Sequence, residues 1–250
     1  MPDRLPALRE DATRLALTLS DAHVEAFEAY LGLVEEWNER AGLTSVSDRD
    51  EMQRRHFGES LALLVALREA GVLPAPMAEG DRTRIADLGP GGGFPGVPMR
   101  ILEPALDLVL VESNQRRAEF LRHLVASLAL DRVEVVTARA EEAGRDPALR
   151  EGFDLVVARA LAPLAVLVEY GVPLLRRGGV LATPKGSRAA EELAEAAGAL
   201  AALGAVALDL VPLSLPAGAP PQTVLVVRRE GDLDERYPRR PGIPSKRPLA

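Results

Sequence analysis

The stretch "IADLGPGGGFPGVPMR", residues 85–100, opens on an apolar run and then packs five glycines and three prolines into a short segment. Glycine has no Cβ, so Gly89, Gly91 and Gly93 allow the backbone to turn tightly and to lie close to a ligand, with its N–H groups free to donate. The later prolines fit a first helical turn, where a missing N–H costs little. The stretch therefore predicts a strand, a ligand-binding turn and a helix. A turn that held no ligand would not need so many glycines.

Two kinds of ligand fit this glycine pattern. Read from Gly91, the sequence matches the G-x-G-x-x-G pattern of dinucleotide-binding turns. Read from Asp87, it gives D-x-G-x-G-x-G, which places a carboxylate where a pyrophosphate would otherwise lie. S-adenosylmethionine carries an ammonium and a sulfonium and has no phosphate, so the carboxylate favours it over a nicotinamide dinucleotide. Alternatively, Asp87 caps the turn, which is compatible with the same cofactor.

Composition sets the broad class of the protein. The 250 residues are 47% hydrophobic and 27% charged, enough for one large domain or a domain with a helical extension. We find no apolar segment long enough to span a membrane and no signal-peptide pattern, so we expect a cytoplasmic location. The net charge of −7 disfavours non-specific coating of nucleic acid. Cysteine is absent, which excludes disulfides, thiolate metal sites and cysteine nucleophiles, and we expect no metal.

The character of the sequence changes near Thr83. Before about residue 70, apolar residues recur at helical spacing, with Ser20 as a plausible helix N-cap, and residues 71–82 are rich in proline and glycine. After Thr83, short apolar runs alternate with amphipathic segments, at roughly 114–128, 162–176 and 187–203. This alternation predicts an α/β fold with a doubly wound, mostly parallel sheet.

The C-terminal part departs from the alternation. The runs "AVALDLVPL" and "QTVLVVRR" are separated by a Pro/Gly-rich segment without a helix, which predicts an antiparallel hairpin. Residues 236–247, "RYPRRPGIPSKR", contain five Lys or Arg and no acid, and their prolines predict an extended arm suited to lying along RNA. We therefore divide the chain into an N-terminal helical extension (1–75), a Rossmann-like domain (76–230) and a basic arm (231–250).

Ligands of an open parallel sheet bind beyond the carboxyl ends of its strands, near the point where the strand order reverses. Glu112 ends the second apolar run, where an acid can accept the ribose hydroxyls of an adenosine; a solvated Glu is the alternative. Ala140 and Glu141 follow the third run, where the adenine would lie, although both also suit an ordinary helix start. Arg159 follows the fourth run and suits a cofactor carboxylate or a substrate phosphate, or else a surface ion pair.

Several ordered motifs resemble one family. They are "LTSV", "RRHFGESL", "DLGPGGGFPGVP", "RAEE", "VVARALAPL", "PKG" and "YPRRPGIPSKRPL". From about Gly42 to its end, the chain resembles the glucose-inhibited division protein B family of bacterial small-subunit ribosomal RNA methyltransferases. The resemblance implies a class I S-adenosylmethionine-dependent methyltransferase with a Rossmann-like, seven-stranded sheet. It also implies methyl transfer to N7 of a guanine in 16S rRNA, with the rRNA or the small ribosomal subunit as partner.

The resemblance also assigns roles to individual residues. It implies that Gly89, Phe94, Ala140, Glu141 and Arg159 contact the cofactor. Candidates for approaching the substrate or organising the site are His56, Lys185, Arg239, Arg240, Lys246 and Arg247.

His56 has an alternative role, and the chain departs from the family at Gly42. His56 could equally be a hydrogen-bonded residue between the helices and the sheet. Lys185 follows the fifth apolar run, where a cation would meet an RNA phosphate. The family commonly has Asn where this chain has Gly42, so any polar contact of that side chain is absent or is supplied by Thr44 or Ser45.

The chemistry of guanine N7 agrees with the residues present. N7 has a free lone pair and no proton to lose, so the reaction needs alignment and a dry pocket rather than a general base. Methylation of a pyrimidine through a cysteine adduct is excluded. Other hypotheses are a methyltransferase acting on another RNA or on a small molecule, a nicotinamide oxidoreductase, and a non-catalytic RNA-binding module.

Overall fold

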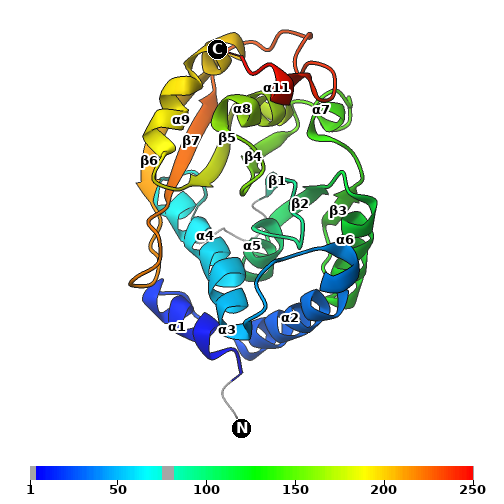
Figure 1. Ribbon diagram of the computed structural model, residues 1–250, viewed down its shortest axis with the longest axis vertical. Helices are drawn as coiled ribbons and strands as arrows, with labels where there is room; N and C mark the ends of the chain where they lie inside the picture. The colour runs from blue at the N-terminus through cyan, green and yellow to red at the C-terminus, as the bar shows by residue number, and fades with distance from the viewer. Residues whose placement is uncertain (1–3, 75–81, 250) are drawn as a thin grey trace.

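The computed structural model describes residues 4–74 and 82–249, and a seven-stranded sheet forms its centre (Figure 1). The spatial order of the strands is β3-β2-β1-β4-β5-β7-β6. The strands are β1 (Thr83–Leu88), β2 (Leu106–Val111), β3 (Val133–Val136), β4 (Phe153–Val157), β5 (Leu175–Lys185), β6 (Ala205–Pro212) and β7 (Thr223–Arg229).

The strand directions confirm the predicted sheet. β1 to β5 pair in parallel, whereas β7 is antiparallel to both β5 and β6. The C-terminal hairpin is therefore formed by β6 and β7, as the Pro/Gly-rich connection between them predicts. The strand order reverses between β1 and β4, which creates a crevice beyond their carboxyl ends. The order, with an antiparallel β7, confirms the Rossmann-like, seven-stranded sheet that the resemblance implies.

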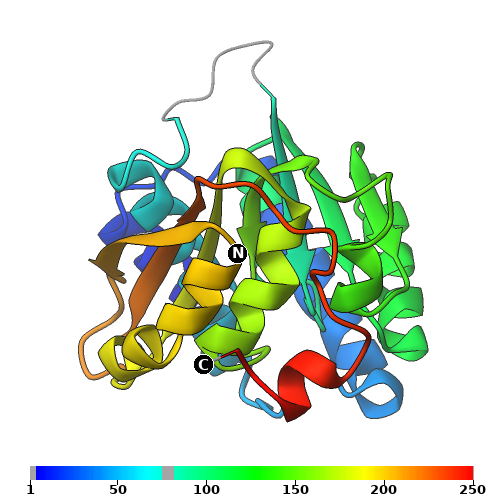
Figure 2. The same cartoon turned by 90° about the horizontal axis from the view of Figure 1, so that it is seen from above.

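Helices cover both faces of the sheet (Figure 2). Ser20 caps the second helix, as predicted, because its hydroxyl accepts a hydrogen bond from the backbone N–H of His23 at 3.2 Å. The helices on the N-terminal side are α1 (Pro6–Arg14), α2 (Asp21–Ala41), α3 (Arg49–Met52), the π-helix η1 (Gln53–Gly58) and α4 (Glu59–Glu69). The remaining helices are α5 (Gly96–Leu102), α6 (Gln115–Ser127), α7 (Ala140–Ala143), α8 (Leu164–Gly171), the 3₁₀-helix η2 (Val172–Leu174), α9 (Ala189–Glu195), α10 (Ala197–Ala202) and α11 (Ile243–Lys246).

Two apolar layers form the core. One buried cluster contains Phe27 and Phe57 of the N-terminal helices together with Leu110 of the sheet. The other contains Phe153 of the sheet and Val168 of α8. The N-terminal helices thus bury their apolar faces against one side of the sheet, so they can carry side chains to the crevice. The predicted connector at 71–82 and the boundary between residues 75 and 76 fall largely outside the described residues.

The C-terminal tail is not the extended arm that its prolines predict. Tyr237 is buried, and the chain then turns into the short helix α11 against α8. The cause is Glu169 of α8, whose side chain is fully buried. Its carboxylate accepts hydrogen bonds from the backbone N–H and Nε of Arg239 at 2.8 Å and from Nη2 at 2.6 Å.

None of the helices in residues 4–74 and 82–249 has the length and apolar character of a transmembrane span.

Candidate functional site

The glycine turn after β1 has the backbone that its sequence predicts. Gly89, Gly91 and Gly93 have φ values of +65°, +57° and +96°, in the region that glycine adopts without strain. A Cβ on Gly89 would lie only 2.7 Å from Cδ1 of Leu161, whereas a Cβ on Gly91 would meet no atom within 4 Å. The turn is therefore packed on one side and open at Gly91, where a ligand can approach the backbone.

Asp87 lies at the end of β1 and is fully buried. Its Oδ2 accepts a hydrogen bond at 2.7 Å from the N–H of Gly96, the first residue of α5. Burial raises the pKa of the Asp87 carboxyl to about 7, although the Gly96 N–H and Arg159 oppose the rise. Its Oδ1 is buried without a partner among the described residues. Asp87 thus binds the N–H at the end of the turn, where α5 begins, in keeping with the turn cap considered from the sequence, and its Oδ1 is still available as an acceptor.

Glu112 directly follows β2 and is not a solvated strand-end residue, since it is only 4% exposed. One carboxylate oxygen accepts from the N–H of Gly91 at 3.1 Å, and the other accepts from the N–H of Asn114 at 2.8 Å. A carboxylate has about four acceptor positions, so these two bonds leave others for hydroxyl groups. Glu112 therefore fixes the turn and can still bind a ribose.

Ala140 and Glu141 begin α7, after β3. Ala140 is half-buried and Glu141 is 3% exposed. The Oε1 of Glu141 accepts a hydrogen bond at 2.8 Å from the N–H of Gly242 in the C-terminal tail. The contact of Ala140 and Glu141 with adenine stays a prediction. The observed hydrogen bond of Glu141 joins the C-terminal tail to the segment that follows β3.

Arg159 lies beyond the end of β4, and the ion pair that it makes with Glu59 is largely shielded from solvent. Its side chain is 18% exposed, and its Nη1 donates to the carbonyl of Arg55 at 2.6 Å and lies 3.5 Å from Oε2 of Glu59. Its Nη2 lies 3.2 Å from Nδ1 of His56. The guanidinium carbon is 5.4 Å from the ring centroid of Phe94, within cation–π range. Arg159 thus joins the sheet to the helical segment around His56.

These contacts define the state of His56. A guanidinium can only donate, so Nδ1 of His56 accepts, and Nε2 carries the proton and donates to Oγ1 of Thr44 at 2.6 Å. Burial, with the nearby positive charges of Arg159 and Arg55, lowers the pKa of His56 to about 3. The imidazole is therefore neutral at physiological pH.

Phe94 ties the turn to the N-terminal helices. Its ring stacks on His56 at 4.6 Å between centroids and on Tyr30 at 5.3 Å. The Tyr30 hydroxyl donates to the carbonyl of Gly92 in the same turn at 2.6 Å. The Phe94 side chain is thus part of a buried aromatic cluster that packs the turn against the N-terminal helices.

The loop that bears Thr44 starts at Gly42, where the resemblance implies an Asn. Gly42 ends α2 with φ 61° and ψ 54°, a left-handed conformation that glycine adopts most readily and asparagine next. Both residues therefore satisfy the same backbone requirement. The side chain of Asn38 holds the loop by accepting from the N–H groups of Leu43 and Thr44 and by donating to the carbonyl of Thr44, each at 2.9 Å.

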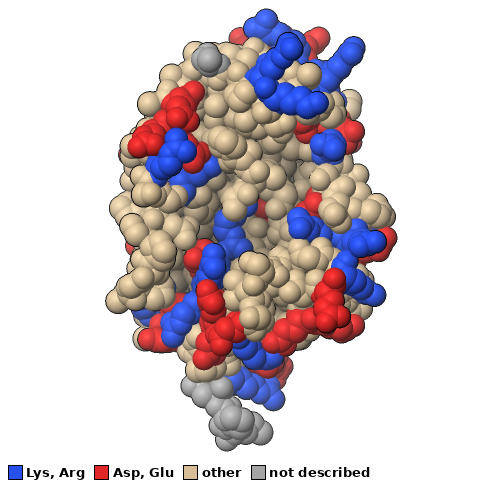
Figure 3. Space-filling view, viewed as in Figure 1, with Lys and Arg blue, Asp and Glu red and all other residues tan. Residues whose placement is uncertain are grey.

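A cavity of about 470 Å³ lies at the carboxyl ends of β4 and β5, a size typical of small-ligand sites. Lys185 lines it, but its Nζ already donates to the carbonyl of Ala162 at 2.7 Å and pairs with Glu192 at 2.8 Å. The lining residues are Arg55, His56, Glu59, Arg159, Ala160, Pro184, Lys185, Gly186, Glu192 and Gln222. Figure 3 shows a hollow in the middle of this face with charged side chains around it.

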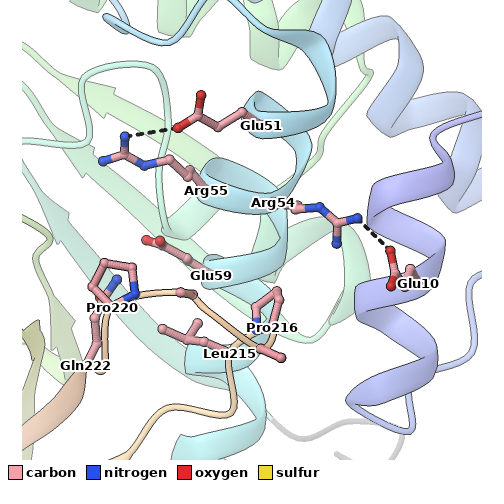
Figure 4. Close-up of a pocket in the computed structure, with 11 residues that line it drawn as sticks. Glu10, Glu51, Arg54, Arg55, Glu59, Leu215, Pro216, Pro220 and Gln222 are labelled. Atoms are coloured by element: carbon pink, nitrogen blue, oxygen red, sulfur yellow. Dashed lines mark hydrogen bonds and ion pairs between the residues drawn. The ribbon is translucent and has the colours of Figure 1, made fainter.

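A second cavity, of about 710 Å³, shares Arg55, Glu59 and Gln222 with the first (Figure 4). In Figure 4, Arg55 and Glu59 extend from the same side of the helix, with Arg55 paired to Glu51, whereas Arg54 points to the opposite side, toward Glu10 of α1. Arg55, Glu59 and Gln222 are functional candidates that were not predicted from the sequence. A signal for Glu59 was present in "RRHFGESL", because a spacing of three residues places it on the same helix face as His56.

The structure brings His56, Arg159 and Lys185 around one cavity, while the basic tail residues lie elsewhere. Arg240, Lys246 and Arg247 are exposed, and Arg239 is held by Glu169. Across residues 4–74 and 82–249, no group of three or more His, Asp or Glu side chains is arranged to hold a metal ion.

Comparison with known proteins gives one family. A family model described as rRNA small subunit methyltransferase G matches residues 23–216. A relative from Roseiflexus castenholzii is 43% identical over 238 residues, which cover 95% of this chain and 97% of the relative. Another, from Desulfitobacterium hafniense, is 41% identical over 236 residues, which cover 94% and 93%. Both are named ribosomal RNA small subunit methyltransferase G.

Solved structures share the fold at low sequence identity. A protein from Corynebacterium glutamicum is 18% identical, with a TM-score of 0.51, over 92% of this chain and 99% of that one. MtNAS, solved in complex with MTA and tNA, is 16% identical, with a TM-score of 0.54, over 82% of this chain and 73% of that one. At these identities the likeness concerns the fold alone.

Proposed function

The chain belongs to the rRNA small subunit methyltransferase G family, and we propose that it methylates N7 of a guanine in 16S rRNA within the cavity beside Arg159. It is an S-adenosylmethionine-dependent methyltransferase whose substrate is small-subunit rRNA. The observation that carries the assignment to this cavity is its position. It opens at the carboxyl ends of β4 and β5, next to the strand-order reversal at β1 and β4.

The residues of the glycine turn fit S-adenosylmethionine. Gly91 leaves open space for a ligand against the backbone. Oδ1 of Asp87 is a buried acceptor without a partner in the described structure, which suits the donors of a cationic ligand. Glu112 retains acceptor capacity for two hydroxyl groups. None of these features requires a ligand with a pyrophosphate.

We assign the cofactor contacts accordingly. Gly89, Gly91 and Gly93 form the turn against which the cofactor lies, with Phe94 fixing its shape. The ribose hydroxyls bind Glu112, and the adenine lies beside Ala140 and Glu141. Arg159 is the donor for the cofactor's carboxylate, which is supported by its position just beyond β4. Asp87 supports the turn and supplies a negative potential beneath it.

Alignment is the main contribution of the protein to the reaction. The bound cofactor supplies a methyl group on a sulfonium, which departs as a neutral thioether. Guanine N7 offers a lone pair and loses no proton, so the site needs to orient the base and exclude water. His56, neutral because of its low pKa, then positions Arg159 rather than accepting a proton.

We further propose that the three segments of the chain have separate tasks. Residues 76–230 bind the cofactor, and residues 1–75 supply His56 and Thr44 as a wall of the site. Residues 231–250 present Arg240, Lys246 and Arg247 to RNA phosphates, in the context of the assembled small subunit. Arg239 keeps this surface in place through Glu169. The cytoplasm, where ribosomal RNA is modified, is the expected location.

The decisive experiment is incubation of the purified protein with labelled S-adenosylmethionine and unmodified small subunits, followed by nucleoside mass spectrometry. We expect label in 7-methylguanosine of 16S rRNA. Label in another nucleoside would overturn the N7 assignment while leaving the cofactor in place. Parallel reactions with naked 16S rRNA distinguish the assembled subunit from free RNA as the substrate.

A further inference from the structure

Glu59 lies where the two cavities meet, and the reaction described above gives it no task. It lines both the cavity of about 470 Å³ and that of about 710 Å³. Its side chain is 19% exposed, so the carboxylate is accessible from the cavities yet largely shielded from bulk water. It begins α4, three residues after His56, and therefore faces the same site.

The Glu59 carboxylate is only partly engaged by the protein. Its Oε2 lies 3.5 Å from Nη1 of Arg159, at the limit of a hydrogen bond, and it also interacts with the Gln222 side chain. Burial raises the pKa of Glu59, while Arg159, Gln222 and Arg55 oppose the rise. Since a carboxylate offers about four acceptor positions, Glu59 can accept further donors.

The other carboxylate of the smaller cavity is more tightly engaged. One oxygen of Glu192 binds Nζ of Lys185 at 2.8 Å and the N–H of Leu164 at 2.9 Å. Glu192 is thereby tied to the start of α8. Of the two acidic side chains lining this cavity, Glu59 is the better placed to accept from a ligand.

Guanine presents a pair of donors that suits such a group. N1–H and one N2–H lie side by side on the pairing edge of the base, and two carboxylate oxygens can accept both. N7 lies on the other ring, so this contact leaves it free for methylation. Adenine has an acceptor at N1, which a carboxylate repels, and polar mismatches of this kind are costly in a shielded site.

We propose that Glu59 is a specificity-determining residue that accepts the N1–H and N2–H of the target guanine. The base occupies the smaller cavity, where His56 and Arg159 provide planar groups that can stack on it. The proposal rests on the proposed function and identifies the group that selects guanine.

Inosine provides the test, because it retains N1–H and N7 but lacks the N2 amino group. Small subunits are reconstituted from 16S transcripts in which inosine replaces a small fraction of the guanosines. After methylation stopped at low conversion, mass spectrometry gives the ratio of 7-methylinosine to 7-methylguanosine, relative to the inosine content. For the wild type we expect discrimination against inosine of on the order of tenfold or more, as for loss of a hydrogen bond to a charged group.

The variant Glu59→Gln should methylate more slowly and lose most of this discrimination. Glu51→Gln is the matched control, because Glu51 lines only the larger cavity and should leave the ratio unchanged. Equal methylation of inosine and guanosine by the wild type would overturn the proposal, as would full discrimination by Glu59→Gln. If the wild type forms neither product, the proposed function itself is wrong.

Discussion

Nη2 of Arg159 lies 3.2 Å from Nδ1 of His56, although 103 residues separate them in the sequence. The same imidazole donates through Nε2 to Thr44. Arg159 is thus held from the N-terminal helices as well as from the sheet. The orientation of the guanidinium therefore depends on two segments that are distant in the sequence.

Replacing Arg159 tests its role in binding. Arg159→Ala should lower kcat/KM for methylation of small subunits by about 100-fold or more, the scale expected when a positioning contact is lost. The fold should survive, because the variant leaves both apolar layers intact. Steady-state kinetics with circular dichroism melting checks both statements. Parental activity in a folded variant would rule out the proposed role.

His56 predicts a specific dependence of stability on pH. Its pKa is about 3 in the folded protein and 6.5 in the unfolded chain. The unfolded chain binds more protons between these values, so His56 lowers stability as pH falls below 6.5. The stability of His56→Gln relative to wild type should therefore rise on acidification from pH 7 to 5, by at most about 1.4 kcal/mol per unit. Urea unfolding at several pH values measures it, and a constant difference would contradict this pKa.

Because of Asp87, we expect the affinity for S-adenosylmethionine to rise with pH. Because the pKa of its carboxyl is raised to about 7, it ionises between pH 6 and 8 and then attracts a cationic ligand more strongly. S-adenosylmethionine should bind more tightly at pH 8 than at pH 6. Titration calorimetry should show this trend in the wild type and its loss in Asp87→Asn. An identical trend in both proteins would remove Asp87 as its source.

The folded position of the C-terminal tail should depend on the ion pair between Arg239 and Glu169. Arg239→Ala leaves the fully buried carboxylate of Glu169 without its cation, and removing one partner of a buried pair typically costs about 3–5 kcal/mol. The Arg239 side chain is 25% exposed, so we expect a loss near or below the lower end of that range. Arg240→Ala, at an exposed neighbour, is the control and should change stability little. Chemical denaturation compares the two, and equal effects would show that the pair is not the anchor.

The exposed cations of the tail should affect the salt dependence of RNA binding. Neutralising Arg240, Lys246 and Arg247 should weaken binding to the small subunit and lower the slope of log affinity against log salt by up to about 2, if each contacts one phosphate. Filter binding at several salt concentrations gives the slope. If the slope does not change, the tail is not part of the RNA interface.

The sequence predicted the parts of this fold and site that depend on local pattern. The glycine turn, the acid at Glu112 and the C-terminal hairpin follow from the order of residue types along the chain, since strands, turns and their ends have local signatures. The same reasoning found Arg159, because it follows the fourth predicted strand.

Features that depend on partners far apart in the sequence were not predictable. The prolines of the tail suggest an extended arm, but Glu169, 70 residues from Arg239, folds the tail onto α8. The solvated alternative for Glu112 failed for a similar reason, because Gly91 binds it from the turn. Composition does not reveal which buried charge will need a distant counter-ion.

The stack of Tyr30, Phe94 and His56 has a consequence for genetics. The turn expected to hold the cofactor is supported by aromatic rings from α2 and η1, and its Gly92 carbonyl is bound by Tyr30. A substitution such as Tyr30→Ala can therefore disable the enzyme without touching either substrate. Inactivating alleles recovered in a selection for lost methylation should cluster in these N-terminal helices as well as in the glycine motif.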